Sequence, residues 1–314
     1  MTSQPLRLGS ISFINSLPVD LGLISGSIPT EAEIVSGVPT TLNENILDGL
    51  LEVSPVSALW YAEHQNKLLL LPDLSISSES GVQSVLLFSR SPLKKLKNKS
   101  ISITPQGRTT PALLEIICFL KYGFRPNVKI ARPNAPVIPE GSEAILLIGN
   151  QALEARARIK DSNVMVTDLA EVWREWTSLP FVFAVWVTRR DFFKDHEKEV
   201  LDLHQALLDS KKWGDQNPEA ILKEAEAKTG LPGELLKGYF SCLSYDFNEG
   251  LKCGLKLYYD YAIRCGILKR VKNFEEIDSR ATRHADPERN EGEASHHVIR
   301  SFVVGAPQDD EARR

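Results

Sequence analysis

Short polar side chains without charge follow several apolar stretches of the sequence. Asn15 comes after the first stretch, Ser57 after the third, and Ser84 directly precedes a later one. Amide and hydroxyl groups both donate and accept hydrogen bonds, so they suit a ligand with several oxygen atoms. The same residue types are common as turn formers and helix caps. The pattern therefore predicts either a site for an oxygen-rich ligand or ordinary turns.

The loop before one predicted helix is the sharpest local signal. We expect Thr110 at the N-cap of this helix and Pro111 at its first position. Free N–H groups and the positive end of the helix dipole suit an anion there. Gly107 would let a ligand approach the backbone, and Thr109 would add a hydrogen-bond donor. Arg108 could bind a carboxylate through two bonds. The alternative is an ordinary capped helix.

Length and charge limit the classes of protein to consider. The 314 residues amount to about two domains. The 37 basic and 41 acidic residues give a net charge of −4, whereas nucleic-acid-binding proteins usually have a basic excess. No apolar run approaches the roughly 18 residues of a membrane-spanning helix, and the N-terminus indicates no signal peptide. We expect a cytoplasmic protein that binds a small molecule, with no nucleic-acid or membrane partner; its oligomeric state is not indicated.

The sequence gives no reason to expect a metal or an organic cofactor. The four cysteines lie singly in apolar or helical contexts, which is typical of buried thiols in a reducing compartment. Zinc-protease, P-loop and dinucleotide-binding motifs are absent. These absences lower the expectation of zinc, nucleotide and redox chemistry.

Apolar stretches alternate with helical patterns along the chain. The predicted strands cover residues 6–13, 32–35, 52–56, 82–88, 100–104, 143–148 and 181–187. A capping box at Thr41 predicts the start of one helix, and Asn248 is expected to cap the last one. Strands that alternate with helices predict an α/β fold with a largely parallel sheet. The charged, glycine-containing segment 278–314 predicts a disordered tail.

Seven motifs together resemble one protein family. They run in order, with similar spacing, as ISFINSLP (11–18), VSPVS (53–57), LLPDLSIS (70–77), SVLLFS (84–89), LIGNQAL (147–153), DLAEVW (168–173) and WTSLPFVFAVW (176–186). The set resembles the chorismate dehydratases of the futalosine route to menaquinone. The resemblance extends from about residue 7 to 268, and the tail lies outside it.

The resemblance implies a fold and a domain organisation. The family has the periplasmic-binding-protein-like fold of type II, with two α/β lobes and a ligand cleft between them. One lobe would comprise residues 1–89 and 186–275, and the other residues 90–185. The helix start at 109–110 would then face Asn15, Ser57 and Ser84 across the cleft.

The resemblance also implies a reaction. The family eliminates water from chorismate and forms 3-[(1-carboxyvinyl)oxy]benzoate, without a cofactor. Asn15 resembles the family's essential asparagine, which would orient a substrate carboxylate or the leaving hydroxyl. Since no histidine, aspartate or glutamate is evidently placed to act as base, we expect the enolpyruvyl carboxylate of the substrate to take the proton.

The sequence departs from the family pattern at four positions. Gly107 stands where serine is common, Arg108 where a small residue is common, and Ser178 where glycine is common. Asn150, an expected substrate-binding residue, stands where aspartate is common. These differences put the substrate in more doubt than the fold.

Two alternatives remain open. The chain could resemble the 1,4-dihydroxy-6-naphthoate synthase of the same pathway, although the Ser-Pro-Cys-Pro-Asn-type motif of that enzyme is replaced here by residues 12–15. It could also be a non-catalytic protein that binds an organic anion, because the fold permits both roles. A catalytic histidine in the cleft would favour the first, and an extracytoplasmic location the second.

Overall fold

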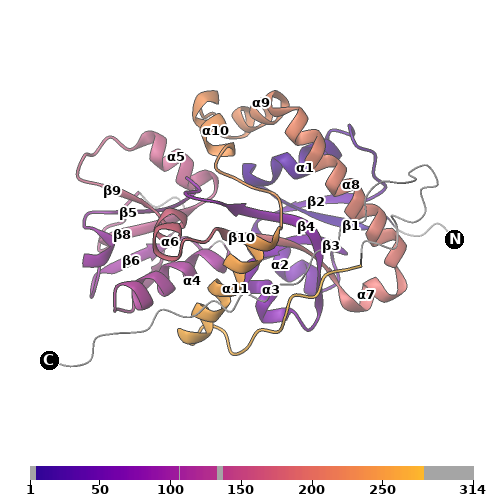
Figure 1. Cartoon of the computed structure of the whole chain (residues 1–314). Coiled ribbons are helices and arrows are strands. Elements are labelled where there is room, and N and C mark those ends of the chain that lie inside the picture. The colour runs from indigo at the N-terminus through magenta and orange to yellow at the C-terminus, as the bar shows by residue number, and fades with distance from the viewer. Residues whose placement is uncertain (1–4, 106, 133–136, 279–314) are drawn as a thin grey trace, which may run out of the picture. The chain divides into compact units, whose positions relative to one another are not determined.

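The computed structural model describes residues 5–105, 107–132 and 137–278. Two five-stranded sheets organise this part of the chain, and Figure 1 shows each with its own helices. The predicted tail 278–314 lies outside the described residues, apart from Asp278 itself. None of the described helices is long and apolar enough to cross a membrane.

The first sheet has the strand order β2-β1-β3-β10-β4. Strand β1 is parallel to β2 and β3, whereas β10 is antiparallel to β3 and β4. The bounds are β1 Arg7–Ile11, β2 Glu33–Gly37, β3 Val53–Ser57, β4 Leu68–Ser78 and β10 Phe181–Arg189.

The second sheet has the order β7-β6-β8-β5-β9. Strand β6 is parallel to β7 and β8, whereas β5 is antiparallel to β8 and β9. The bounds are β5 Val85–Ser89, β6 Ser100–Ile103, β7 Asn127–Ile130, β8 Ala144–Ile148 and β9 Met165–Asp168.

Both sheets are therefore mixed, and the prediction of a largely parallel sheet is wrong. The strands β5 and β10, which enter a sheet just after the chain has crossed between the two sheets, run against their neighbours. Both strands are almost wholly buried and apolar. A buried strand shows the same run of apolar residues whether it is parallel or antiparallel to its neighbours, so the sequence pattern could not reveal the orientation of β5 and β10.

The helices pack on the faces of the sheets. In Figure 1, α1 and α8 lie on one side of the first sheet and α2 and α3 on the other. The bounds are α1 Leu17–Ile24, α2 Pro39–Leu47, α3 Ala58–His64, α4 Thr109–Ile116, α5 Asn150–Arg158, α6 Leu169–Thr177, α7 Arg190–Asp195, α8 Glu197–Gln216, α9 Pro218–Thr229, α10 Gly233–Phe240 and α11 Glu249–Arg264. Short 3₁₀ turns cover Ile14–Ser16 and Leu93–Lys95, and a π-helical segment, Ile117–Lys121, extends α4.

Two predicted helix starts are wrong and one is confirmed. Helix α2 begins at Pro39, ahead of the predicted box at Thr41, because proline at the first position needs no N–H partner. Helix α4 begins at Thr109, so Thr110 lies inside the helix and is not its N-cap. Asn248 caps α11 as predicted, because its Oδ1 accepts the N–H of Leu251 at 3.0 Å.

The chain passes between the sheets at two short crossings. It leaves the first sheet after Ser78 and enters the second at Val85; it returns after α6 and enters β10 at Phe181. The chain thus passes from one sheet to the other a few residues before each of the lobe boundaries expected at residues 89 and 186. These boundaries stay a prediction. Asp168 fixes the first crossing, since its Oδ2 accepts the N–H groups of Val82 and Gln83 at 2.8 and 2.7 Å.

Ser178, at the second crossing, occupies the left-handed region with φ +60° and forms the C-cap of α6. This region costs a non-glycine residue about 1 kcal/mol or more. We expect Ser178→Gly to raise the free energy of unfolding by about 0.5–1 kcal/mol, after the entropy of the unfolded chain is included. Chemical denaturation measures it. Ser241, a helix C-cap with φ −67°, is the control, and Ser241→Gly should destabilise; equal effects at both positions would contradict the conformational explanation.

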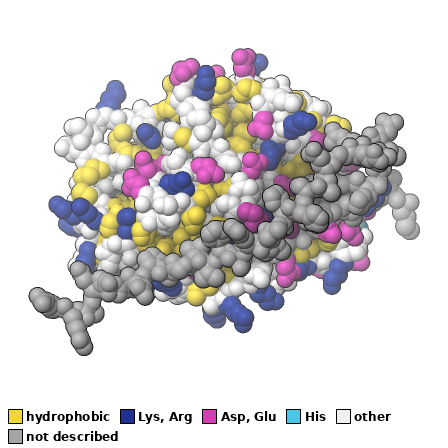
Figure 2. All heavy atoms as spheres, in the orientation of Figure 1, with side chains coloured by type: hydrophobic (Ala, Val, Ile, Leu, Met, Phe, Trp, Pro, Cys, Tyr) yellow, Lys and Arg dark blue, Asp and Glu magenta, His cyan; other side chains and the backbone are white. Residues whose placement is uncertain are grey.

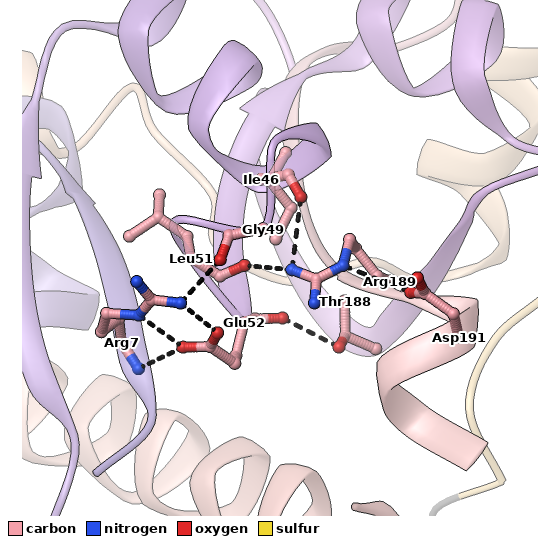
Figure 3. Close-up of polar contacts among 8 residues, drawn as sticks. All are labelled: Arg7, Ile46, Gly49, Leu51, Glu52, Thr188, Arg189 and Asp191. Atoms are coloured by element: carbon pink, nitrogen blue, oxygen red, sulfur yellow. Dashed lines mark hydrogen bonds and ion pairs between the residues drawn. The ribbon is translucent and has the colours of Figure 1, made fainter. Parts of the chain in front are cut away.

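A partly buried ion pair between Arg7 and Glu52 joins strands of the first sheet (Figure 3). Glu52 precedes β3 and receives three bonds from Arg7: from the backbone N–H at 2.7 Å, from Nε at 3.1 Å and from Nη2 at 2.6 Å. Arg189 binds the carbonyl of Leu51 at 2.7 Å, and the hydroxyl of Thr188 donates to the carbonyl of Glu52 at 2.9 Å. The network therefore joins β1, β10 and the start of β3.

Candidate active site

One cavity of about 70 Å³ is lined by strands and loops from both sheets. Seven of the eight predicted site residues line it, namely Asn15, Ser57, Ser84, Gly107, Arg108, Thr109 and Thr110. Asn150 is not among the lining residues, although Gly149 before it is. Apolar side chains, including those of Phe13 and Phe183, complete the wall.

Four helices begin beside the cavity. Pro39 is the first residue of α2, Ser57 the N-cap of α3, Arg108 the N-cap of α4 and Gly149 the N-cap of α5. Each helix start carries a partial positive charge and N–H groups without a partner in the helix. Their convergence favours a negatively charged ligand.

Thr109 connects the start of α4 to the first sheet. Its Oγ1 accepts the N–H of Leu59 at 3.1 Å, and it lies 3.1 Å from Ser57 Oγ and 3.2 Å from the carbonyl oxygen of Phe183. The hydroxyl has one proton, so it donates to one of these two oxygens at a time. Thr109 is buried, and its hydroxyl therefore holds the two sides of the cavity together.

Two neighbouring tyrosines on α11 form hydrogen bonds with the first residues of α4 and α3. The hydroxyl of Tyr258 donates to the carbonyl of Thr109 at 3.0 Å, and the hydroxyl of Tyr259 donates to the carbonyl of Ala58 at 2.6 Å. Both rings are buried. Neither tyrosine is among the site residues predicted from the sequence; the adjacent pair was the available signal.

Arg108 also lines the cavity, but its guanidinium makes a different contact from the one predicted. It forms an ion pair with Glu63 of α3, and the side chains are 51% and 19% exposed. The pair joins the start of α4, beside the second sheet, to a helix of the first. The predicted grip of Arg108 on a substrate carboxylate stays a prediction, and it requires the guanidinium to turn from Glu63 or to serve both groups.

Asn15 lies in the 3₁₀ turn after β1, and its amide oxygen is buried without a hydrogen-bond partner among the described residues. Asn150, at the start of α5, binds the same turn: its Oδ1 accepts the N–H of Ile14 at 3.1 Å. The geometry thus gives Asn150 a positioning contact, while its predicted contact with substrate stays a prediction. A buried acceptor without a partner is costly unless a ligand supplies the donor.

Two side chains that sequence reasoning missed hold the serines of the site. Asn43, in the middle of α2, accepts the N–H of Ser57 on its Oδ1 at 3.1 Å. Tyr239 of α10 donates its hydroxyl proton to Ser84 Oγ at 3.2 Å. A buried asparagine inside a helix is unusual, and it was the signal available for Asn43.

Two glycines allow the backbone to form the cavity wall. Gly107 has φ +81°, so the serine common in the family would be strained in this loop. Gly149 has φ +60° and ψ −142°, and a Cβ atom there would come within 2.8 Å of the ring of Phe13. Because Gly149 has no side chain, its backbone can lie against the ring of Phe13, which also lines the cavity.

A buried carboxyl group lies close to the turn that carries Asn15. Asp20 of α1 is 2% exposed, and its Oδ2 accepts the hydroxyl of Ser10 at 2.6 Å. Burial raises the pKa of Asp20 to about 6, and the hydrogen bonds from Ser10 and Ser16 offset part of this effect. Asp20 does not belong to the described lining of the cavity.

This raised pKa predicts how stability changes with pH. A carboxyl whose pKa rises from 3.8 to about 6 on folding binds its proton more tightly in the folded state. Its contribution to stability is therefore present below pH 3.8 and is lost as the pH rises through about 6. Relative to Asp20→Asn, the wild type should lose about 3 kcal/mol of unfolding free energy over that interval. Denaturation curves at several pH values measure the difference; a constant difference would contradict a buried, titrating Asp20.

The fold and the cavity define a class of protein. Two mixed α/β sheets, two crossings between them and a cavity lined from both sheets are the features of the two-lobed fold of periplasmic binding proteins. The alkanesulfonate-binding protein SsuA from Xanthomonas axonopodis pv. citri superposes with a TM-score of 0.65 over 86% of this chain and 96% of its own, at 12% identity. A protein from Archaeoglobus fulgidus superposes with a TM-score of 0.66 over 85% of this chain and its own full length, at 21% identity.

Within this class, the chain belongs to the menaquinone biosynthesis family, whose model matches residues 6–264. It is similar to a chorismate dehydratase from Thermus thermophilus, with 29% identity over 72% of this chain and 84% of the relative. It is also similar to a chorismate dehydratase from Campylobacter jejuni, with 29% identity over 56% of this chain and 64% of the relative. The resemblance drawn from the seven motifs is confirmed.

Proposed function

We propose that the protein is a chorismate dehydratase, a carbon–oxygen lyase of menaquinone biosynthesis that acts in the cytoplasm. The proposal is supported by the family match and by the two relatives of that name. The observation that carries it in the structure is the cavity at which four helices begin and to which Asn15, Ser57, Ser84 and Thr110 contribute uncharged polar groups. Chorismate has two carboxylates, a hydroxyl and an ether oxygen, which match such a lining.

The reaction removes a proton and a hydroxyl from neighbouring ring carbons. The C–H bond on the ether-bearing carbon breaks first, and its electron pair delocalises through the diene into the ring carboxylate. The bond from the next carbon to the hydroxyl then breaks, the ring becomes aromatic, and the proton and hydroxide leave as water. Helix starts and N–H groups that face the ring carboxylate would stabilise the charge that develops there.

The described lining suits binding better than proton abstraction. It contains amide, hydroxyl, backbone and apolar groups, and the guanidinium of Arg108, which has only donors. We propose that the enolpyruvyl carboxylate of the substrate takes the proton, because it is tethered through the ether oxygen to the carbon that loses it. The protein would then hold this carboxylate in the productive orientation. The small cavity requires the two lobes to separate before the substrate enters.

The test is to incubate the purified protein with chorismate and to follow the diene absorbance and the mass of the product. A product lighter by one water, formed without any additive, supports the proposal. Binding without turnover would instead favour the alternative of an organic-anion-binding protein. Absence of both would shift the search to the dihydroxynaphthoate synthase reaction and to other dicarboxylates.

Arg108 offers a test of the predicted carboxylate contact. If the guanidinium turns from Glu63 to the substrate, Arg108→Ala should raise KM for chorismate about tenfold or more, and Glu63→Gln should lower KM. If Arg108 serves only the ion pair with Glu63, both variants should change KM alike. Steady-state kinetics of the two variants distinguish these results, and an unchanged KM in Arg108→Ala would contradict the predicted contact.

A further inference from the structure

A second, larger cavity of about 390 Å³ lies beside the site, between α8, α9, α10 and the segment that follows α10. Lys211, Asp215 and Phe240 are among its lining residues. Leu243 lines this outer cavity and the active-site cavity as well. It also packs against the core clusters on both sides, and its side chain is half-buried. The side chain of Leu243 therefore forms part of the wall between the active-site cavity and the outer cavity.

The backbone around Leu243 is held in place by β4. Ser77 and Ser244 exchange N–H···O bonds of 2.9 Å in both directions, as in a short antiparallel pair. The N–H of Ser75 donates to the carbonyl of Tyr245 at 3.1 Å, and the hydroxyl of Ser77 donates to the carbonyl of Ser244 at 3.0 Å. The hydroxyl of Ser75 adds a bond to the carbonyl of Asp246. The segment thus adds a short edge to the first sheet directly after Leu243.

Charged groups on the two sides of Leu243 differ. The outer cavity carries Lys211, whose Nζ pairs with Asp246 at 2.6 Å, and the exposed Asp215. Burial raises the pKa of Asp215. Figure 2 shows Lys, Arg, Asp and Glu side chains interspersed over the visible face of the described residues. The outer cavity is thus lined by two lysines and two aspartates, whereas Arg108 is the only charged residue among the described lining of the active-site cavity.

We propose that Leu243 is a specificity-determining residue of this site: its side chain closes the active-site cavity against the outer cavity and limits the size of the ligand. The proposal rests on the proposed function for the identity of the substrate, but the wall itself can be tested by binding alone. Replacing leucine by alanine removes the branched end of the side chain and would join the two volumes. A larger ligand could then extend into the outer cavity.

The probe is 3-phenoxybenzoate, which keeps a benzoate ring and a meta ether but replaces the enolpyruvyl group by a larger ring. Calorimetry with Leu243→Ala should show Kd for this probe about tenfold lower than with the wild type. The same variant should show kcat/KM for chorismate reduced about tenfold, mainly through KM, because an apolar contact is lost. Leu243→Met, which keeps the volume, should behave as the wild type.

The matched control is Leu222→Ala. Leu222 is half-buried like Leu243, but it lines only the outer cavity and not the active-site cavity. It should change neither measurement more than about twofold. Equal affinity of Leu243→Ala and wild type for the probe, or no binding by either, would overturn the proposal. If the wild type fails to dehydrate chorismate, the proposed function fails, while the binding comparison still decides whether Leu243 is the wall.

Discussion

Asn15→Ala should lower kcat for chorismate by about 10²–10³-fold and leave the protein folded. The Oδ1 atom of Asn15 is buried at the cavity and has no partner within the described part of the chain, so the substrate hydroxyl can donate to it while the amide N–H groups bind a carboxylate. Loss of one preorganised group in a water-excluded site typically has an effect of this size. The effect should fall on kcat more than on KM, because the amide orients groups that react.

The measurement is steady-state kinetics of Asn15→Ala beside a control asparagine. Asn127→Ala serves, since Asn127 is exposed on β7, at the edge of the second sheet, and it should leave turnover unchanged. Asn15→Asp should be as inactive as Asn15→Ala, because a carboxylate at this position repels the anionic substrate. Unchanged turnover in Asn15→Ala would show that the amide does not orient the reacting groups.

Glu52→Gln should lower the free energy of unfolding by about 2–3 kcal/mol at pH 7. Its carboxylate is 8% exposed and accepts three bonds from Arg7 (Figure 3), and breaking a buried pair typically costs about 3–5 kcal/mol. We use a smaller value because the Arg7 side chain is 35% exposed and therefore partly screened. Glu224→Gln, in an exposed pair with Lys228, should cost less than about 0.5 kcal/mol.

The Glu52 effect should also depend on pH, with the opposite sign to that of Asp20. Burial alone would raise the pKa of Glu52, but the hydrogen bonds and the charge of Arg7 outweigh it, and the pKa lies below its ordinary value. The stabilisation is therefore complete above the unfolded pKa of about 4.3 and is lost as the pH falls through the folded pKa. Denaturation of wild type and Glu52→Gln at pH 7 and about pH 3 measures this. A gap of equal size at both pH values would contradict the ion-pair explanation.

Local features of the fold could be predicted from the sequence. The strands beginning near Arg7, Glu33 and Ser100 and the cap at Asn248 depend on apolar periodicity and on one side chain, which the sequence displays directly. The start of α2 was missed because proline at position 39 begins a helix without a side-chain cap. Strand direction was missed because it depends on where the chain crosses between sheets, which is a long-range property.

Seven of the eight residues predicted for the site line one cavity, but the contacts between its residues could not be predicted from the sequence. The residues after strands and before helices do meet at one cavity, as expected for the ends of α/β strands. The pairing of Arg108 with Glu63 and the support of Ser57 by Asn43 join residues far apart in the sequence. No local pattern encodes such pairs. They became visible only when the fold placed α2, α3 and α4 around the same cavity.

The central claim is that this site positions a substrate which supplies its own base. The most direct test compares chorismate with the analogue in which the enolpyruvyl carboxylate is a methyl ester, using mass spectrometry to detect the loss of water. The account predicts that the protein dehydrates chorismate and leaves the ester intact, even where the ester binds. Dehydration of the ester at the rate of chorismate would contradict it and would require a base within the protein.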